Sequence, residues 1–382
     1  MYNIGLNMPL PPEQVKFQEA IQQSTRVDVE RFHEDAGLLT QLPVLVMTVK
    51  TWDNTGLRAS RAQAGKSGVN YGMDKRKDLE GERGGLVVLD PANREFRRLG
   101  NKDIYGPRGI EVHGEHIFVG TSKGVEVFDK TMQRQGTILD DFGYCIHAVR
   151  AVEIDGSQKL IMGSSRLGTM MEYDFATGQV ERRWVGWENG FPQSHAGVLV
   201  TASEEEYEIR IEAGGEAVLF DKSDPKANLE KLTTSRQASR INGIFITPDK
   251  MILATLFSGQ LIELKEVSER SRPRVIAAGL FNPHSPQLIE DNYWAANTHR
   301  GEVVRFGLDG ELICSYAFSN SLVSEGKIPV WLQSIVNIDG LMVAVDSTRQ
   351  ELVVLDIENQ QRTNVSFPDG RWAVQEVTSF ES

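Results

Sequence analysis

The chain has 382 residues, of which 40% are hydrophobic and 8% aromatic, which is enough apolar side chain for a packed core. Acidic residues outnumber basic ones, and the formal net charge of -12 argues against nucleic acid or an anionic membrane as a partner of the whole surface. The only cysteines, Cys145 and Cys314, are too few for a disulfide framework and form no CxxC metal motif, so a reduced, cytoplasmic location is expected.

The first residues carry no pattern for export or membrane insertion. MYNIGLNMPLPPEQ has no basic start and no apolar core, and no apolar run in the chain approaches the ~18 residues of a membrane span, so no membrane partner is expected. Residues 12–39 form the best helical segment, because two prolines open it and Val15, Phe17 and Ile21 are spaced for one apolar face. Residues 1–42 are therefore predicted to be a helical extension.

The remainder of the chain, residues 43–382, reads as one domain built from repeats. A pattern of strand, tight turn, strand, tight turn and strand recurs at roughly 40-residue spacing. Residues 43–52 and 84–90 supply two strands of a further unit, and a lone strand at 371–380 ends the chain. The six complete copies begin at Arg108, Arg150, His195, Asn242, His284 and Gln333.

These repeats predict an all-β fold, a seven-bladed β-propeller. The C-terminal strand would become the innermost strand of the first blade and close the ring, which hides the edges of the sheets. Six and eight blades are the alternatives, because the copy that begins at His195 is irregular.

In a propeller, the residues that open the innermost strands surround one mouth of the central channel. Packing alone does not require polar residues there, so the sequence predicts a functional pocket, with a hydrogen-bonded structural plug as the alternative. The opening residues are Arg108, Arg150, His195, Asn242, His284, Gln333 and, for the closing strand, Trp372, and His147 lies three residues before Arg150.

Histidines at this mouth suggest metal or acid–base chemistry. Neutral imidazole is the commonest protein ligand of transition metals, so His147, His195 and His284, with Gln333, are predicted to hold one divalent metal ion. The same histidines could instead act as acids and bases without a metal, or serve only the structure. All three are candidate catalytic residues.

Guanidinium groups at the mouth predict an anionic ligand. Arg108 and Arg150 present planar donor forks that suit a carboxylate or a phosphate, and both are candidate catalytic residues. Further cations lie in turns on the same face, although exposed turns commonly carry Lys and Arg without any function. The predicted substrate-binding residues are Asn242, Gln333, Trp372, His299, Arg300, Arg166 and Arg349.

A long insertion, residues 53–83, replaces a tight turn of the first blade and so belongs on the mouth face. Loops of this length are usually functional or disordered, and this one is a candidate lid, with a surface loop as the alternative.

The units resemble NHL-like and gluconolactonase-like propellers, a group that includes virginiamycin B lyase-like proteins. The resemblance rests on GIEVHGEHIFVGT (109–121) and NPHSPQLIEDNYWAANTHRGEVVRF (282–306). It implies a divalent metal or a polar cluster at the mouth, at positions His195, Asn242, His284 and Gln333, but the acidic metal ligand of gluconolactonases has no counterpart among the opening residues.

The sequence thus predicts an enzyme of lyase, cyclase or hydrolase type that acts on a small anionic metabolite in the axial pocket. No nucleotide-binding motif is present to support phosphoryl transfer or redox chemistry. A non-catalytic propeller that binds a ligand or a protein partner through the same face is the alternative.

Overall fold

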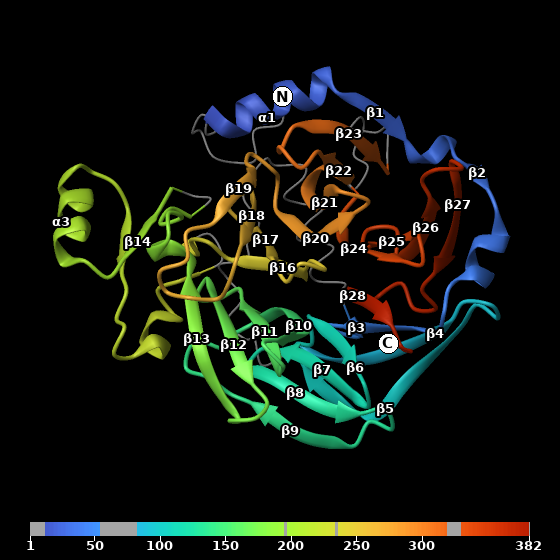
Figure 1. Cartoon of the computed structure of the whole chain (residues 1–382), viewed down its shortest axis with the longest axis horizontal. Helices are drawn as coiled ribbons and strands as arrows, with labels where there is room; N and C mark the ends of the chain where they lie inside the picture. Colours follow the sequence, from blue (N-terminus) through green and yellow to red (C-terminus); the bar gives the residue numbers. More distant parts are fainter. Residues whose placement is uncertain (1–11, 54–81, 195–196, 234–235, 319–329, 382) are drawn as a thin grey trace.

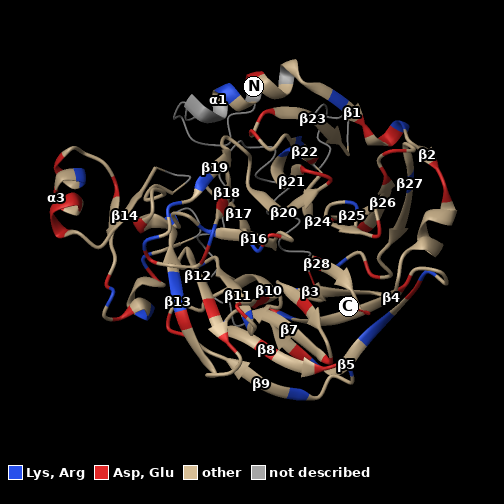
Figure 2. Ribbon diagram, in the orientation of Figure 1, with Lys and Arg blue, Asp and Glu red and all other residues tan. Residues whose placement is uncertain are grey.

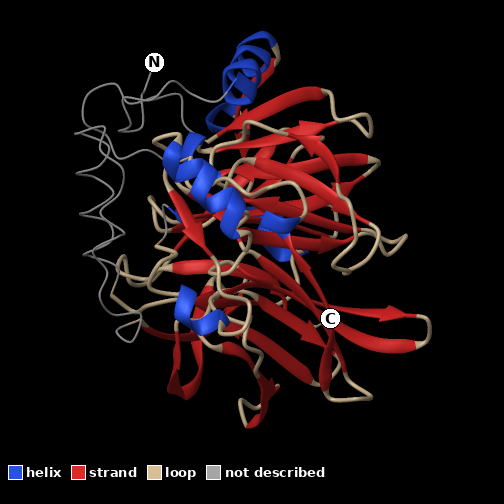
Figure 3. Ribbon diagram, turned by 90° about the vertical axis from the view of Figure 1, so that its left-hand side faces the viewer, coloured by secondary structure: helices blue, strands red, loops and turns tan. Residues whose placement is uncertain are grey.

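The computed structural model describes residues 12–53, 82–194, 197–233, 236–318 and 330–381. In these residues the fold is an all-β propeller, with six blades arranged around a central axis (Figure 1). No helix among them is long and apolar enough to cross a membrane. Seen from the side of α3, the strands make up most of the molecule and the helices are few and short (Figure 3).

Each blade has four antiparallel strands, named here from the axis outward. Blade 1 is β28 (Val374–Ser379), β3 (Leu45–Val49), β4 (Arg83–Asp90) and β5 (Glu95–Tyr105). Blade 2 is β6 (Ile110–His113), β7 (His116–Thr121), β8 (Gly124–Asp129) and β9 (Arg134–Ile138). Blade 3 is β10 (Ile146–Ile154), β11 (Ser157–Ser164), β12 (Thr169–Asp174) and β13 (Gln179–Val185).

The other three blades follow the same order. Blade 4 is β16 (Ile241–Ile246), β17 (Ile252–Leu256), β18 (Gln260–Leu264) and β19 (Arg274–Ala277). Blade 5 is β20 (Pro283–Ile289), β21 (Asn292–Asn297), β22 (Glu302–Phe306) and β23 (Leu312–Ala317). Blade 6 is β24 (Leu332–Ile338), β25 (Leu341–Asp346), β26 (Glu351–Asp356) and β27 (Gln361–Ser366).

The prediction of seven blades is wrong, because the copy that begins at His195 does not form a blade. It contains β14 (Leu199–Thr201) and β15 (Ala217–Leu219), which pair parallel, and the helix α3 (Glu204–Glu212) between them. The alternating run YEIRIE suggested a strand. The Ser203 side chain instead accepts a hydrogen bond from Glu206 N at 3.3 Å, and three glutamates in the first turn favour a helix start, which colours much of α3 red in Figure 2.

The N-terminal segment is only partly helical. After α1 (Pro12–Gln23) it forms β1 (Thr25–Asp28) and β2 (His33–Glu34), which pair parallel with the outer strands of blades 5 and 6. These two short strands cover edges that would otherwise be open to another chain. The 3₁₀ turns of the structure are η1 (Val29–Arg31), η2 (Ala36–Gln41), η5 (Gly186–Glu188), η6 (Pro225–Asn228) and η8 (Thr298–Arg300).

The hydrophobic core is divided among the junctions between neighbouring blades. A separate apolar cluster fills each of the six junctions, and a seventh lies beneath the insertion with α3. Each blade therefore buries both of its faces only when both neighbours are present. The ring closes where β28 pairs antiparallel with β3, as the sequence predicted.

Candidate functional site

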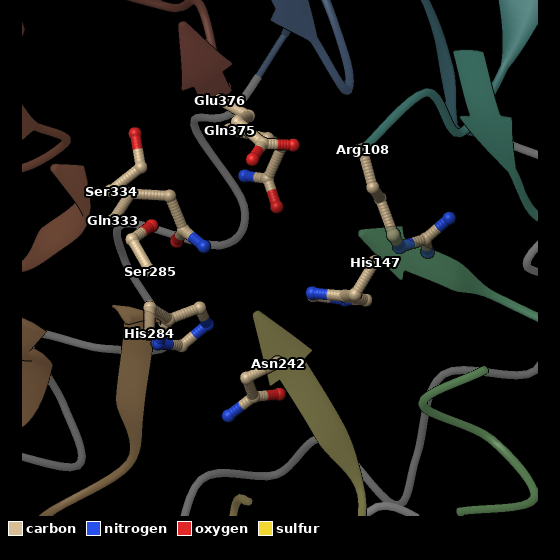
Figure 4. A pocket seen from close by; sticks show the side chains of 9 residues that line it. All are labelled: Arg108, His147, Asn242, His284, Ser285, Gln333, Ser334, Gln375 and Glu376. Carbon is tan, nitrogen blue, oxygen red and sulfur yellow. The ribbon is translucent and has the colours of Figure 1, made fainter. Parts of the chain in front are cut away.

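A polar pocket lies on the axis of the propeller (Figure 4). Every blade contributes at least one side chain to its wall, so the site exists only in the closed ring. The lining residues are Arg108, His147, Asn242, His284, Ser285, Gln333, Ser334, Gln375 and Glu376.

Irregular inner strands turn these side chains toward the axis. A regular inner strand presents its backbone edge to the channel and its side chains to the neighbouring blades. In five of the six blades the inner strand breaks its register at the pocket. The residues at these irregularities include His147, Asn242, Ser285, Gln333 and Gln375–Glu376, which is consistent with the ability of a β-bulge to redirect a side chain.

In three of the blades a residue with a positive φ angle lies just before the inner strand. Each lies two positions before a charged or titratable lining residue: Gly106 before Arg108, Cys145 before His147 and Asn282 before His284. At Gly106 a Cβ atom would approach Ser122 Oγ to 2.3 Å, so that turn requires glycine. Strained backbone held at one mouth is a common feature of functional sites.

The hydrogen bonds of His284 define which of its nitrogens is basic. Nδ1 lies 3.0 Å from the Asn282 carbonyl oxygen and 2.9 Å from Thr298 Oγ1. A carbonyl oxygen only accepts, so we assign the proton of the neutral ring to Nδ1 and the lone pair to Nε2. The ring is 4% exposed and lies in the pocket wall. In this tautomer the proton-accepting nitrogen of the ring is Nε2.

His147 is held neutral beside a guanidinium. Burial lowers its pKa well below the usual value, and the positive charges of Arg240 and Arg108 lower it further. Nε2 lies 3.4 Å from Arg240 Nη2, which can only donate, so the ring proton is assigned to Nδ1. The rings of His147 and His284 are 6.2 Å apart between centroids, which brings together two of the three histidines predicted for this mouth.

Arg108 is buried in the wall, with 3% of its surface exposed, and is neutralised there. It donates to Glu82 Oε2 at 3.0 Å and to the Gly106 carbonyl at 2.6 Å. Lys50 shares the same carboxylate, with its Nζ 2.9 Å from Glu82 Oε1.

Arg150 does not line the pocket. His147 lies at the start of the inner strand of blade 3, and Arg150 follows three residues later in the same strand. It pairs with Glu376 at 2.5 Å and lies 3.8 Å from Glu111. These carboxylates also accept hydrogen bonds from backbone N–H groups of neighbouring inner strands, Glu376 from Ile110 at 2.9 Å and Glu111 from Ala151 at 3.3 Å. The cluster therefore ties blades 1, 2 and 3 together at the axis.

The predicted outer residues occupy varied positions. Trp372 packs against Trp52, with ring centroids 5.7 Å apart, and is absent from the pocket wall because the bulge of β28 presents Gln375 and Glu376 instead. The other four lie in turns on the mouth face: His299 packs on Trp331, Arg300 on Phe281, Arg349 pairs with Glu30, and Arg166 donates to the Leu229 carbonyl. Their binding roles stay predictions. His195 and nearly all of the candidate lid 53–83 lie outside the described residues.

The described residues alone do not make a fitting metal site. They contain no group of three or more His, Cys, Asp or Glu that could hold a metal ion. The His147 imidazole lies near Arg108 and Arg240, whose positive charges oppose a divalent cation. The prediction that His147, His195, His284 and Gln333 bind a metal stays a prediction, and no chemical step is derived from it below.

Sequence reasoning missed the carboxylates at the axis and the cation Arg240. Glu376 and Gln375 were missed because a bulge adds a residue without leaving a mark in the apolar pattern. The sequence does mark two other pocket residues, Arg108 and His284. Gly-Pro-Arg at 106–108 and Asn-Pro-His at 282–284 share a left-handed residue, a proline and a basic side chain. Arg240 carried no comparable signal.

Comparison with known proteins supports the architecture. No family model and no curated protein matches the chain. A protein of unknown function from Bacteroides caccae is 10% identical, with a TM-score of 0.50 over 88% of this chain and 98% of that chain. A chain of a nidogen/laminin complex is 8% identical, with a TM-score of 0.52 over 88% and 97%.

A streptogramin B lyase structure is also similar, with 12% identity and a TM-score of 0.42 over 70% of this chain and 71% of that chain. The first two similarities confirm the predicted resemblance to β-propellers as architecture. At such low identities the likeness shows the fold alone, and the score of the third adds no argument about chemistry.

Proposed function

We propose that the axial pocket binds a small anionic metabolite and that the chain is an enzyme that moves a proton on it, in lyase, cyclase or hydrolase chemistry. One observation carries the proposal: the imidazole rings of His147 and His284 lie 6.2 Å apart between centroids in a pocket walled by all six blades. Both rings are assigned the Nδ1–H tautomer, but the protein contacts different nitrogens. His284 donates from Nδ1 to the Asn282 carbonyl and has its lone pair on Nε2, whereas His147 accepts from Arg240 at Nε2 and has its proton on Nδ1.

In this arrangement His284 Nε2 would accept a proton from the metabolite, or from a water that attacks it. His147 stays neutral at pH 7 and would donate a hydrogen bond to an oxygen on which negative charge develops. The cations around the mouth would attract an anionic metabolite to an otherwise acidic protein. Asn242 and Gln333 supply neutral amides to the same wall.

The test is turnover of a panel of small carboxylated and phosphorylated metabolites, followed by mass spectrometry. At least one should be consumed by the wild type, and His284→Gln should lower kcat by about 100-fold or more while its circular dichroism spectrum stays unchanged. His116→Gln is the control, because His116 is exposed at the opposite end of the blade 2 hairpin. Binding without any turnover would overturn the enzymatic half of the proposal and favour a binding propeller.

A second experiment distinguishes metal-free from metal-dependent catalysis. Turnover should be unchanged by EDTA and by added Mn²⁺, Fe²⁺, Zn²⁺ or Ca²⁺ if the imidazoles act alone. A strict requirement for one of these cations would instead support the predicted histidine ligand set and contradict the metal-free form.

A further inference from the structure

Two guanidiniums behind the pocket wall have no acidic partner among the described residues: Arg240, which contacts the wall residue His147, and Arg166, which is close enough to Arg240 to lower its pKa. Arg166 lies in the turn between β11 and β12, and Arg240 lies directly before β16, so both belong to the junction of blades 3 and 4. Arg166 Nη2 donates to the Leu229 carbonyl at 2.5 Å, and the Arg240 guanidinium lies 5.1 Å over the Phe257 ring. Neither forms an ion pair with a carboxylate among the residues that the structure describes.

Unused donors on the same side chains strengthen this observation. In the described part of the chain, Nε of Arg166 and Nε of Arg240 are both buried and have no hydrogen-bond partner. Buried donors are nearly always satisfied in folded proteins, by protein groups, water or a ligand. Two orphaned guanidinium donors near one pocket suggest a missing acceptor.

Among the described residues around Arg240, cations outnumber carboxylates. Four positive charges act on His147 or on Arg240 or are Arg240 itself: Lys50, Arg108, Arg166 and Arg240. Lys50 and Arg108 share the Glu82 carboxylate. Burial, together with the positive charges of Arg108 and Arg166, lowers the pKa of Arg240 to about 10. A cation in such surroundings is costly unless an anion compensates it.

The backbone holds Arg240 in a defined position. Ser239 has a positive φ of 46° and is fully buried. It packs against Gly186 so tightly that a Cβ on that glycine would come within 2.4 Å of Ser239 Cβ. This packing fixes the backbone that leads into Arg240, whose Nη2 lies 3.4 Å from His147 Nε2.

We propose that Arg166 and Arg240 form the anion subsite of the axial pocket and bind the doubly charged oxyanion group of the ligand, either a phosphate monoester or a pair of carboxylates. This inference rests on the proposed function and refines it. Arg108 and Arg150 are neutralised by Glu82 and Glu376, so they organise the wall, whereas Arg166 and Arg240, which form no ion pair within the described residues, would attract the charge. The anion would then lie next to His147, and the adjoining carbon would lie between the two imidazoles.

Calorimetric titration with inorganic phosphate, succinate and acetate tests the subsite. Wild type should bind phosphate or succinate more tightly than acetate, and the better of the two identifies the ligand class. Arg166→Gln and Arg240→Gln should each raise that Kd by about tenfold or more. Lys123→Gln, in the corresponding exposed turn of blade 2, controls for a general loss of positive charge and should bind as wild type does.

Thermal unfolding provides a readout that a structural role would not give. Without anion, Arg240→Gln should unfold at the same temperature as wild type or higher, because an uncompensated cation has been removed. At one fixed concentration of phosphate or succinate, the wild type and Lys123→Gln should gain more stability than Arg166→Gln and Arg240→Gln. Arg240→Lys should keep part of the binding, since it retains the charge and loses the donor fork.

Two outcomes would overturn the subsite: no binding of any of the three anions to wild type, or equal binding by wild type and both arginine variants. If the second outcome appears while metabolite turnover still depends on His284, the proposed function stands and the anion binds elsewhere in the pocket. Loss of turnover in His284→Gln with anion binding intact would support both proposals.

Discussion

Single residues at the axis combine structural and chemical roles, and Glu111 is the clearest case. Burial raises the pKa of its carboxyl from 4.5 to about 7, although Arg150 and the Ala151 N–H favour the charged form. The unfolded chain therefore releases this proton at a lower pH than the folded chain does. Ionised Glu111 lowers the free energy of unfolding progressively as the pH rises from about 4.5 to 7, and the loss is complete above that range.

Glu111→Gln should consequently be more stable than wild type at pH 8, by up to about 3 kcal/mol, and the difference should vanish near pH 4.5. Glutamine keeps an acceptor for Ala151 N, and Arg150 keeps Glu376. Denaturant unfolding of both proteins across this pH range measures the difference. Glu115→Gln, in the exposed turn after β6, is the control, and a difference that does not depend on pH would contradict the assignment.

At the scale of elements, short segments outside the repeats complete the propeller. Val29 and Phe32 lie between β1 and β2 and are buried in the cluster between blades 5 and 6. β1 pairs parallel with β23 and β2 pairs parallel with β27, so the two short strands cover the outer edges of the same two blades. The N-terminal segment is therefore part of the propeller's stability, although it supplies no blade.

Phe32→Ala should lower the free energy of unfolding by about 3 kcal/mol, because it leaves a cavity in a packed cluster. Val15→Ala, on the exposed face of α1, should change it by less than about 0.5 kcal/mol. Chemical denaturation provides both values, if the free energy of unfolding of each variant is extrapolated with the same dependence on denaturant concentration. Equal, small effects would show that the N-terminal segment is dispensable.

At the scale of the whole molecule, ring closure determines both stability and the site. β28 joins β3 across almost the full chain, and Glu376 N donates to Thr48 Oγ1, 328 residues away in sequence. The same strand brings Val374 and Val377 to the cluster between blades 6 and 1, and Gln375 and Glu376 to the pocket.

Truncation after residue 370 should therefore abolish cooperative unfolding and anion binding together, because blade 1 loses its inner strand and the pocket loses a wall. A synthetic peptide of residues 371–382 should restore part of both. Removal of only Glu381 and Ser382, beyond β28, is the control and should have little effect. Calorimetric scans with and without peptide measure the result, and a truncated chain that unfolds like wild type would contradict this account.

The sequence by itself determined the propeller and its closure, since alternating apolar runs and tight turns follow from local chemistry. It also identified Arg108, His147, Asn242, His284 and Gln333 as neighbours, because repeats place equivalent residues around one axis. The tertiary structure decided the number of blades, because β14 and β15 pair with each other in a separate parallel sheet and form no four-stranded blade. It also decided which side chains reach the axis. Bulges, left-handed residues and charge pairing between blades depend on packing, which one blade's sequence does not encode.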